Sequence, residues 1–132
     1  MDDKNLIEIA RNAMEKAYVP YSKFRVGAAL LTNDDRVITG CNIENASFGG
    51  TNCAERTALF KAISEGYKSF KKIAIISESS NYTYPCGICR QVLSEFCPEL
   101  EVIVANNRGE YKTHKLSELL PYAFTNDDME GR

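Results

Sequence analysis

Several features that are common in other classes of protein are missing from this 132-residue sequence. It has no tryptophan, one histidine and no long apolar run, so no segment approaches the roughly 18 apolar residues of a transmembrane helix. The polar start, Met1-Asp2-Asp3-Lys4, is unlike a secretory signal. Neither sign of charge dominates, because 16 basic and 18 acidic residues leave a net charge of −2. The sequence therefore predicts neither a nucleic-acid partner nor a membrane partner.

Cysteines are few but informative. The chain contains five, an odd number, at positions 41, 53, 86, 89 and 97. With no secretory signal, this pattern favours the reducing cytoplasm, where cysteines more often bind metal or react than form disulfides. Disulfides are also not needed for folding, since 132 residues with 44% hydrophobic content can bury a core as one domain. We therefore expect a single cytoplasmic domain spanning residues 1–132.

Hydrophobic periodicity predicts alternating helices and strands. The predicted helices span 3–17, 53–65, from Cys86 to before Pro98, and 116–120; the predicted strands span 24–31, 37–44, 73–76, 102–105 and 110–114. The first two strands form an antiparallel hairpin, and the unit from Ile73 to Val104 forms a parallel, right-handed crossover. The predicted fold is α/β, a three-layer α-β-α sandwich with a mixed five-stranded sheet. The polar tail from Thr125 is expected to be flexible.

Two short motifs point to chemistry: Cys53-Ala54-Glu55, and Pro85-Cys86-Gly87-Ile88-Cys89. Three thiolates can hold a zinc ion and leave its fourth tetrahedral position open, which is typical of a catalytic site. Cys86 and Cys89 are three residues apart at a predicted helix start, so their thiols face the same way. Helix N-termini also favour thiolates. Glu55 is well placed to handle the proton of a metal-bound water.

A zinc ion with three thiolates carries a net charge of −1, which weakens it as a Lewis acid. Arg56 follows directly after the first motif and is predicted to donate a hydrogen bond to one of the sulfurs. Arg90 is interpreted instead as an exposed helix position.

Two other interpretations of the cysteines remain open. Cys86-Gly87-Ile88-Cys89 alone is also typical of a redox dithiol in thioredoxin-like folds. That hypothesis leaves the Cys53 motif unexplained, and no tryptophan precedes the dithiol. A structural zinc site could be closed by a fourth ligand from Cys41, Cys97 or His114, all three of which we interpret as non-ligands.

Four segments carry a resemblance to a known family: Phe24-Arg25-Val26-Gly27-Ala28-Ala29-Leu30, Gly40-Cys41-Asn42-Ile43-Glu44-Asn45-Ala46-Ser47, Cys53-Ala54-Glu55-Arg56-Thr57-Ala58 and Pro85-Cys86-Gly87-Ile88-Cys89-Arg90-Gln91. A metal ligand, any residue and glutamate, followed later by Pro-Cys-x-x-Cys, is the signature of zinc-dependent nucleobase deaminases. Together the segments resemble the small homotetrameric cytidine deaminases of the cytidine and deoxycytidylate deaminase superfamily. A related aminohydrolase, blasticidin-S deaminase, shares the cysteine motifs and the size.

The resemblance implies hydrolytic deamination of cytidine and deoxycytidine in pyrimidine salvage, by a homotetramer with one zinc ion per subunit. It implies that Cys53, Cys86 and Cys89 bind the zinc and that Glu55 shuttles protons. The implied substrate contacts are Phe24 and the backbone at Ala54 for the base, and Asn42 and Glu44 for the ribose.

Ala46, Phe48 and Phe124 are implied to reach into the site of a neighbouring subunit. Phe48 stands where the family usually has tyrosine, so any contact of that hydroxyl with the ribose is in doubt. From the residues alone, Phe24 could equally belong to the core of a strand. Asn42 and Glu44 alternate along a predicted strand and could mark its solvated face.

Overall fold

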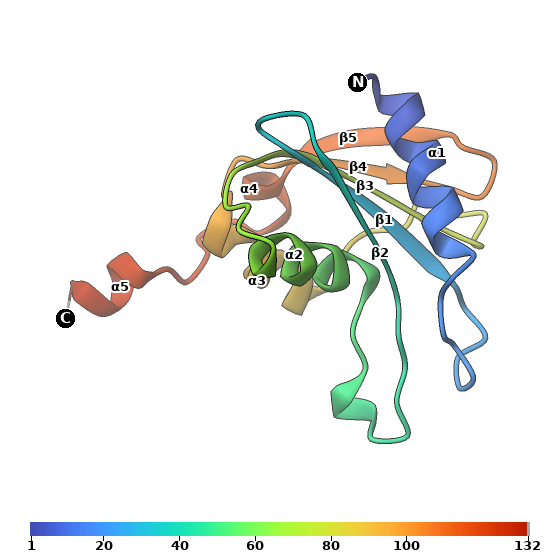
Figure 1. The fold of residues 1–132 in the computed structure, drawn as a ribbon. Helices are drawn as coiled ribbons and strands as arrows, with labels where there is room; N and C mark the ends of the chain where they lie inside the picture. Colours follow the sequence, from blue (N-terminus) through green and yellow to red (C-terminus); the bar gives the residue numbers. More distant parts are fainter. Residues whose placement is uncertain (132) are drawn as a thin grey trace.

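The computed structural model describes residues 1–131 and contains a mixed five-stranded sheet (Figure 1). The strands lie in the order β2-β1-β3-β4-β5. Only the β3–β4 pair is parallel among the described pairs. Their bounds are β1 Val26–Thr32, β2 Val37–Cys41, β3 Phe70–Ser77, β4 Glu101–Ala105 and β5 Tyr111–Lys115. The predicted antiparallel hairpin and parallel crossover pairing are confirmed.

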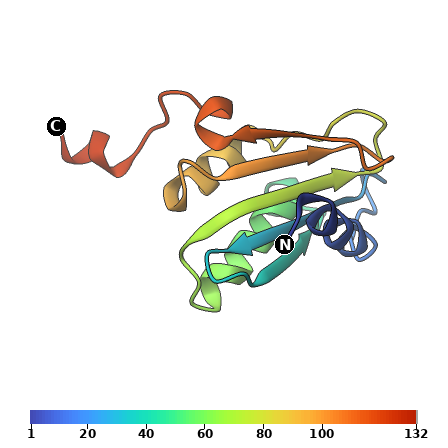
Figure 2. The same ribbon diagram turned by 90° about the horizontal axis from the view of Figure 1, so that it is seen from above.

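Helices cover both faces of the sheet, which confirms the predicted three-layer α/β sandwich (Figures 1 and 2). One helix, α1 (Asp3–Met14), packs on one face. The opposite face carries α2 (Ala54–Ser64), α3 (Gly87–Phe96) and α4 (Leu116–Leu119). None of the helices within residues 1–131 is long and apolar enough to cross a membrane.

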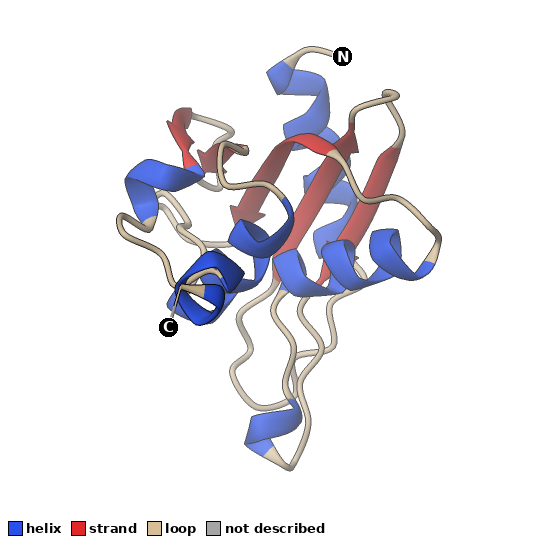
Figure 3. Cartoon of the chain, turned by 90° about the vertical axis from the view of Figure 1, so that its left-hand side faces the viewer, coloured by secondary structure: helices blue, strands red, loops and turns tan. Residues whose placement is uncertain are grey.

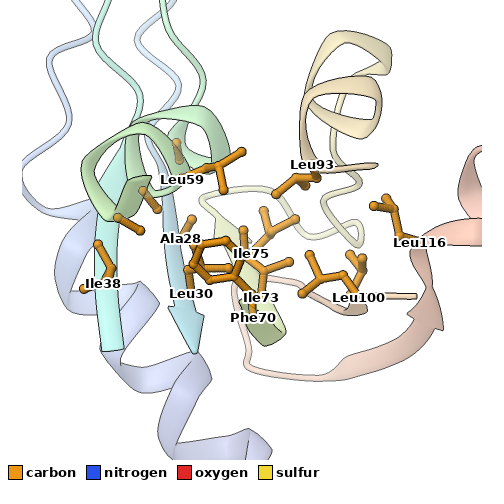
Figure 4. Close-up of a cluster of buried hydrophobic side chains, with 14 of the residues drawn as sticks. Ala28, Leu30, Ile38, Leu59, Phe70, Ile73, Ile75, Leu93, Leu100 and Leu116 are labelled. Carbon is orange, nitrogen blue, oxygen red and sulfur yellow. The ribbon is translucent and has the colours of Figure 1, made fainter. Parts of the chain in front are cut away.

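Strand alternation divides the core into two clusters, one on each side of the sheet. Ala28 and Leu30 of β1 point towards α2 and α3, where Figure 4 shows them with Ile75 and Leu93. Ala29 and Leu31 point the other way, towards α1. Because both faces are covered, the central strands are almost continuously apolar rather than alternating with polar residues.

The first helix and the first strand are shorter than predicted. Helix α1 ends at Met14 because the next turns tighten, with Lys16 N donating to Ala13 O at 3.1 Å. Strand β1 begins at Val26 rather than at residue 24, since the Arg25 N–H donates to Glu78 Oε1 at 2.8 Å instead of to a neighbouring strand.

The second strand ends at Cys41 rather than at residue 44. Ile43 then forms single bridges to Tyr18 and Asn52, which hold two loops together beyond the sheet. The loop between Ile43 and Asn52 contains a 3₁₀ turn at Phe48–Gly50. Figure 3 shows this loop projecting away from the strands. The predicted strand over 37–44 was therefore too long, because its last residues pair with loops.

The tail forms a short helix, α5 (Asn126–Glu130), which the sequence did not predict. Its start is capped by the Thr125 N–H, which donates to Asp128 Oδ2 at 2.7 Å. The helix lies away from the sheet (Figures 1 and 2). None of its described residues is buried.

Two glycines let helices rest directly on the sheet. A Cβ placed on Gly27 would lie 2.1 Å from Ala10 O in α1. A Cβ on Gly40 would lie 2.4 Å from Ala54 O at the start of α2. Both distances are far below van der Waals contact, and both obstacles are backbone atoms that cannot rotate away. The start of α2 is therefore positioned by its contact with Gly40.

We expect Gly40→Ala to lower the free energy of unfolding by about 1–3 kcal/mol, because the added methyl group must push α2 off β2. Urea denaturation followed by circular dichroism measures this change. The matched control is Gly49→Ala, where a Cβ would meet nothing within 4 Å. Equal stability of the two variants would show that α2 does not depend on this contact.

Candidate active site

The starts of α2 and α3 meet at one point and bring three sulfur atoms together. Cys53 is the N-cap residue of α2, Cys86 is the N-cap residue of α3, and Cys89 lies in the first turn of α3. The three Sγ atoms lie within 4.8 Å of one another, and those of Cys53 and Cys86 are 3.7 Å apart. Residues 33 positions apart in sequence thus form one cluster.

The spacing of these sulfurs fits a tetrahedral metal ion. Sulfurs held about 2.3 Å from such an ion lie about 3.8 Å apart, whereas a disulfide brings them to about 2.05 Å. All five cysteines are free thiols. Within residues 1–131, this cluster is the one group of ligand side chains close enough to share a metal. Cys97 Sγ instead donates to Phe70 O, and His114 contacts Tyr84.

Two hydrogen bonds stabilise negative charge on Cys53. A hydrogen bond from Cys89 and another from Arg56 lower the pKa of Cys53 to about 5. The Arg56 Nη2–Cys53 Sγ distance is 3.2 Å, so Arg56 contacts the sulfur as the sequence predicted. Arg90 behaves differently: it donates to Pro85 O and Leu119 O, both at 2.8 Å, and so ties the loop before Cys86 to the end of α4.

Glu55 lies one residue into α2 from Ala54 and is only 4% exposed. Burial raises the pKa of its carboxyl to about 7. A carboxyl in this range can both accept and donate a proton near neutral pH, which is the property required of a general acid–base catalyst. Its pKa is therefore matched to proton transfer beside the cysteine cluster.

A cavity of about 210 Å³ opens onto the cluster. Six of the residues singled out from the sequence line it: Phe24, Asn42, Cys53, Ala54, Glu55 and Cys86. Sequence analysis missed five other lining residues: Val26, Thr51, Asn52, Thr83 and Tyr84. Each of these lies within three residues of a predicted site residue, so proximity to the motifs was the available signal.

Asn42 secures the wall of this cavity through its side chain. Its Oδ1 accepts from Val26 N at 2.9 Å, and its Nδ2 donates to Phe24 O at 2.8 Å. Phe24 is not a core residue, since it is 40% exposed and lines the cavity. Asn42 thereby holds the backbone on both sides of Arg25 in position.

Glu44 faces an adjoining cavity of about 380 Å³, which shares Thr51 with the first. Its carboxylate accepts hydrogen bonds from the Ser22 hydroxyl, from Ser22 N at 3.0 Å and from Tyr21 N at 3.1 Å. These bonds, led by the one from the Ser22 hydroxyl, lower the pKa of Glu44. Asn42 and Glu44 therefore both organise loops beyond the sheet, one at each cavity.

The three residues expected to reach a neighbouring subunit are all exposed. Phe48 is 75% exposed, lines the adjoining cavity and contacts the Tyr21 ring edge-on at 5.8 Å. Ala46 lies two residues before Phe48 in the same loop. Phe124 is 61% exposed, and its carbonyl accepts from Gln91 Nε2 at 2.8 Å. Ala46 and Phe124 do not line the cysteine cavity of their own chain.

Comparison with known proteins finds similar sequences and structures among the deaminases. The family model of the cytidine and deoxycytidylate deaminase zinc-binding region matches residues 1–105. A cytidine deaminase of Halalkalibacterium halodurans is 55% identical over 130 residues, 98% of each chain. The crystal structure of a cytidine deaminase from Burkholderia pseudomallei superposes with a TM-score of 0.91 at 52% identity, covering 94% of this chain and 100% of that one. A blasticidin-S deaminase of Bacillus cereus is 31% identical over 131 residues, 93% of this chain and 92% of its own.

We expect Asn42→Ala to destabilise the fold by about 1–3 kcal/mol, because the half-buried Val26 N–H loses its acceptor. Hydrogen exchange of the Val26 amide should accelerate, and urea denaturation should give a lower free energy of unfolding. Asn81→Ala, at an exposed loop position, is the control. Unchanged exchange at Val26 would contradict the anchoring role of Asn42.

Proposed function

Because the chain belongs to the cytidine and deoxycytidylate deaminase family, we propose that it hydrolyses cytidine and deoxycytidine to uridine and deoxyuridine, releasing ammonia. The protein is therefore an enzyme of a hydrolytic deaminase family. One observation carries the proposal: three free sulfurs cluster at two helix starts, and two of them, those of Cys53 and Cys86, line a cavity together with a buried carboxyl whose pKa is about 7.

We infer that Cys53, Cys86 and Cys89 hold one zinc ion per chain. Their separations and the low pKa of Cys53 support this set of ligands. When bound, zinc lowers the pKa of a coordinated water from about 16 towards 7 and so supplies a nucleophile at neutral pH. Arg56 offsets part of the negative charge of the three sulfurs through its hydrogen bond to Cys53.

Glu55 moves the protons in the proposed reaction. It takes a proton from the attacking water as oxygen adds to C4 of the cytosine ring, and it delivers that proton to N3. A second transfer through Glu55 carries the proton of the new C4 hydroxyl to the 4-amino nitrogen, the C4–N4 bond breaks as C4 becomes a carbonyl, and ammonia leaves. Such proton transfer typically contributes about 10²–10⁴ to the rate. The buried position of Glu55 keeps its pKa near the working pH.

Four residues of the same chain are proposed to hold the nucleoside. Phe24 packs against the base, and the backbone at Ala54 holds its edge. Asn42 and Glu44 bind the ribose. A carboxylate offers about four acceptor positions. Glu44 uses three of them on Tyr21 and Ser22, in the loop before β1, which leaves capacity for one ribose hydroxyl.

We also propose that the enzyme is a cytoplasmic homotetramer acting in pyrimidine salvage. In this assembly Ala46, Phe48 and Phe124 complete the site of a neighbouring subunit. Their exposure, and the projection of the Phe48 loop beyond the sheet, support such a contact (Figure 3). Burial of the exposed Phe48 ring against a second copy, together with the exposed Tyr21 ring that it contacts, would remove apolar surface from water.

Blasticidin-S deamination is the second candidate activity, because one relative of that name is 31% identical to the chain. The relative named cytidine deaminase at 55% identity favours cytidine. A thiol redox protein would hold no metal as purified and would reduce disulfides. Metal content measured beside the absorbance change of cytidine on deamination separates all three activities.

We expect Glu55→Gln to lower kcat for cytidine by at least about 100-fold, because the amide cannot relay protons. The variant should remain folded and keep its zinc, as measured by atomic absorption. Glu65→Gln, at the exposed end of the same helix, should retain normal kcat. Near-normal turnover by Glu55→Gln would remove this residue from proton transfer.

We expect Glu44→Gln to raise KM for cytidine more than for 3′-deoxycytidine, because only cytidine offers the hydroxyl that the carboxylate binds. Ser22→Ala weakens the same loop without changing the carboxylate, so it should affect both substrates equally. Steady-state kinetics on the two nucleosides give the comparison. Equal losses for Glu44→Gln would exclude a contact with the 3′-hydroxyl.

A further inference from the structure

The single histidine of the chain contacts a wall of the candidate active site. His114 Nε2 lies 3.0 Å from the Tyr84 hydroxyl, and the two ring centroids are 5.4 Å apart. His114 lies on β5, opposite Val102 of β4, and Tyr84 lies in the loop between β3 and α3. Tyr84 also lines the cavity that opens onto the cysteine cluster. The pair thus connects an edge strand to the site.

The backbone around Tyr84 is restrained on both sides. Thr83 N donates to Ala105 O at 3.3 Å, and the Thr83 hydroxyl lies 2.5 Å from that of Ser77. On the other side, Pro85 O accepts from Arg90 at 2.8 Å. With the backbone held, the remaining freedom of Tyr84 is rotation of its side chain. The hydrogen bond to His114 restrains that rotation, since it engages the hydroxyl at the far end of the ring.

Tyr84 lines the same cavity as two residues of the proposed reaction. Tyr84 precedes Cys86 by two residues, and both line the cavity together with Glu55. In the proposed function, C4 of the base lies beside these groups, so the substituents nearest to this wall are those on the 4-amino nitrogen and on C5. A ring fixed there limits how large those substituents can be.

We propose that Tyr84 is a specificity-determining residue, and that His114 is the positioning residue that holds its ring against the cavity. Together they exclude pyrimidine nucleosides with added alkyl groups on the reacting edge of the base. This inference rests on the proposed deaminase function. It requires no charge on His114, because the constraint is the fixed volume of the Tyr84 ring.

The test compares kcat/KM for cytidine, 5-methylcytidine and N4-methylcytidine. Tyr84→Ala removes the side chain that forms this wall. We therefore expect the ratio of kcat/KM for cytidine to that for at least one methylated nucleoside to fall by about tenfold or more. This is the usual effect of one methyl group in a fitted pocket. Tyr84→Phe and His114→Gln each break the hydrogen bond and keep the ring, so each should relax discrimination by a smaller factor. Combining these two changes should add little, because they remove the same interaction.

The control is Tyr111→Phe, which removes a hydroxyl from the same strand as His114. It should leave kcat/KM unchanged for all three nucleosides. Thermal melting and zinc content establish that each variant is folded, and Tyr84→Leu replaces Tyr84→Ala if the latter does not fold. Unchanged discrimination in the folded Tyr84 variant overturns the inference. Failure of the unmodified enzyme to deaminate cytidine overturns the proposed function instead, so the two failures are distinct.

Discussion

The convergence of two helix starts is the constraint on which the site depends. Cys53 and Cys86 occupy N-cap positions, where the free N–H groups of α2 and α3 favour negative charge on a side chain. Their sulfurs lie 3.7 Å apart, although 33 residues separate them. That distance is maintained by the sheet, because α2 rests on β2 through Gly40 and α3 follows β3 by way of a loop held by Arg90. A shift of either helix would separate the sulfurs.

Glu55 and Cys53 lie in different electrostatic environments, although they are only two residues apart. Glu55 is removed from water, which raises the pKa of its carboxyl to about 7, whereas Cys53 is stabilised as a thiolate by Cys89 and Arg56. The pKa values of Glu55 and Cys53 are thus displaced in opposite directions. This difference in environment favours proton exchange at Glu55 and negative charge on Cys53.

Polar side chains around the site hold its loops in place through hydrogen bonds. Asn42 and Glu44 hold the loops at Phe24 and at Ser22 through hydrogen bonds within the chain. Arg90 and His114 act similarly on the segment from Thr83 to Cys86. Restraints made within the chain lower the free energy that substrate binding must provide to order the walls.

The sequence by itself determined the order of helices and strands from α1 to α4, the two-sided burial of the sheet and the identity of the cysteine cluster. These features follow from local periodicity and from the chemistry of ligands at helix starts, and both are visible along the chain. It did not determine where strands end, since the pairing of Ile43 with Tyr18 and Asn52 depends on distant loops. Nor did it identify Asn52, Thr83 or Tyr84 as cavity walls. Only the tertiary structure decided those positions and the pKa of Glu55, because burial, cavity shape and the contact of Tyr84 with His114 arise when segments far apart in sequence pack together.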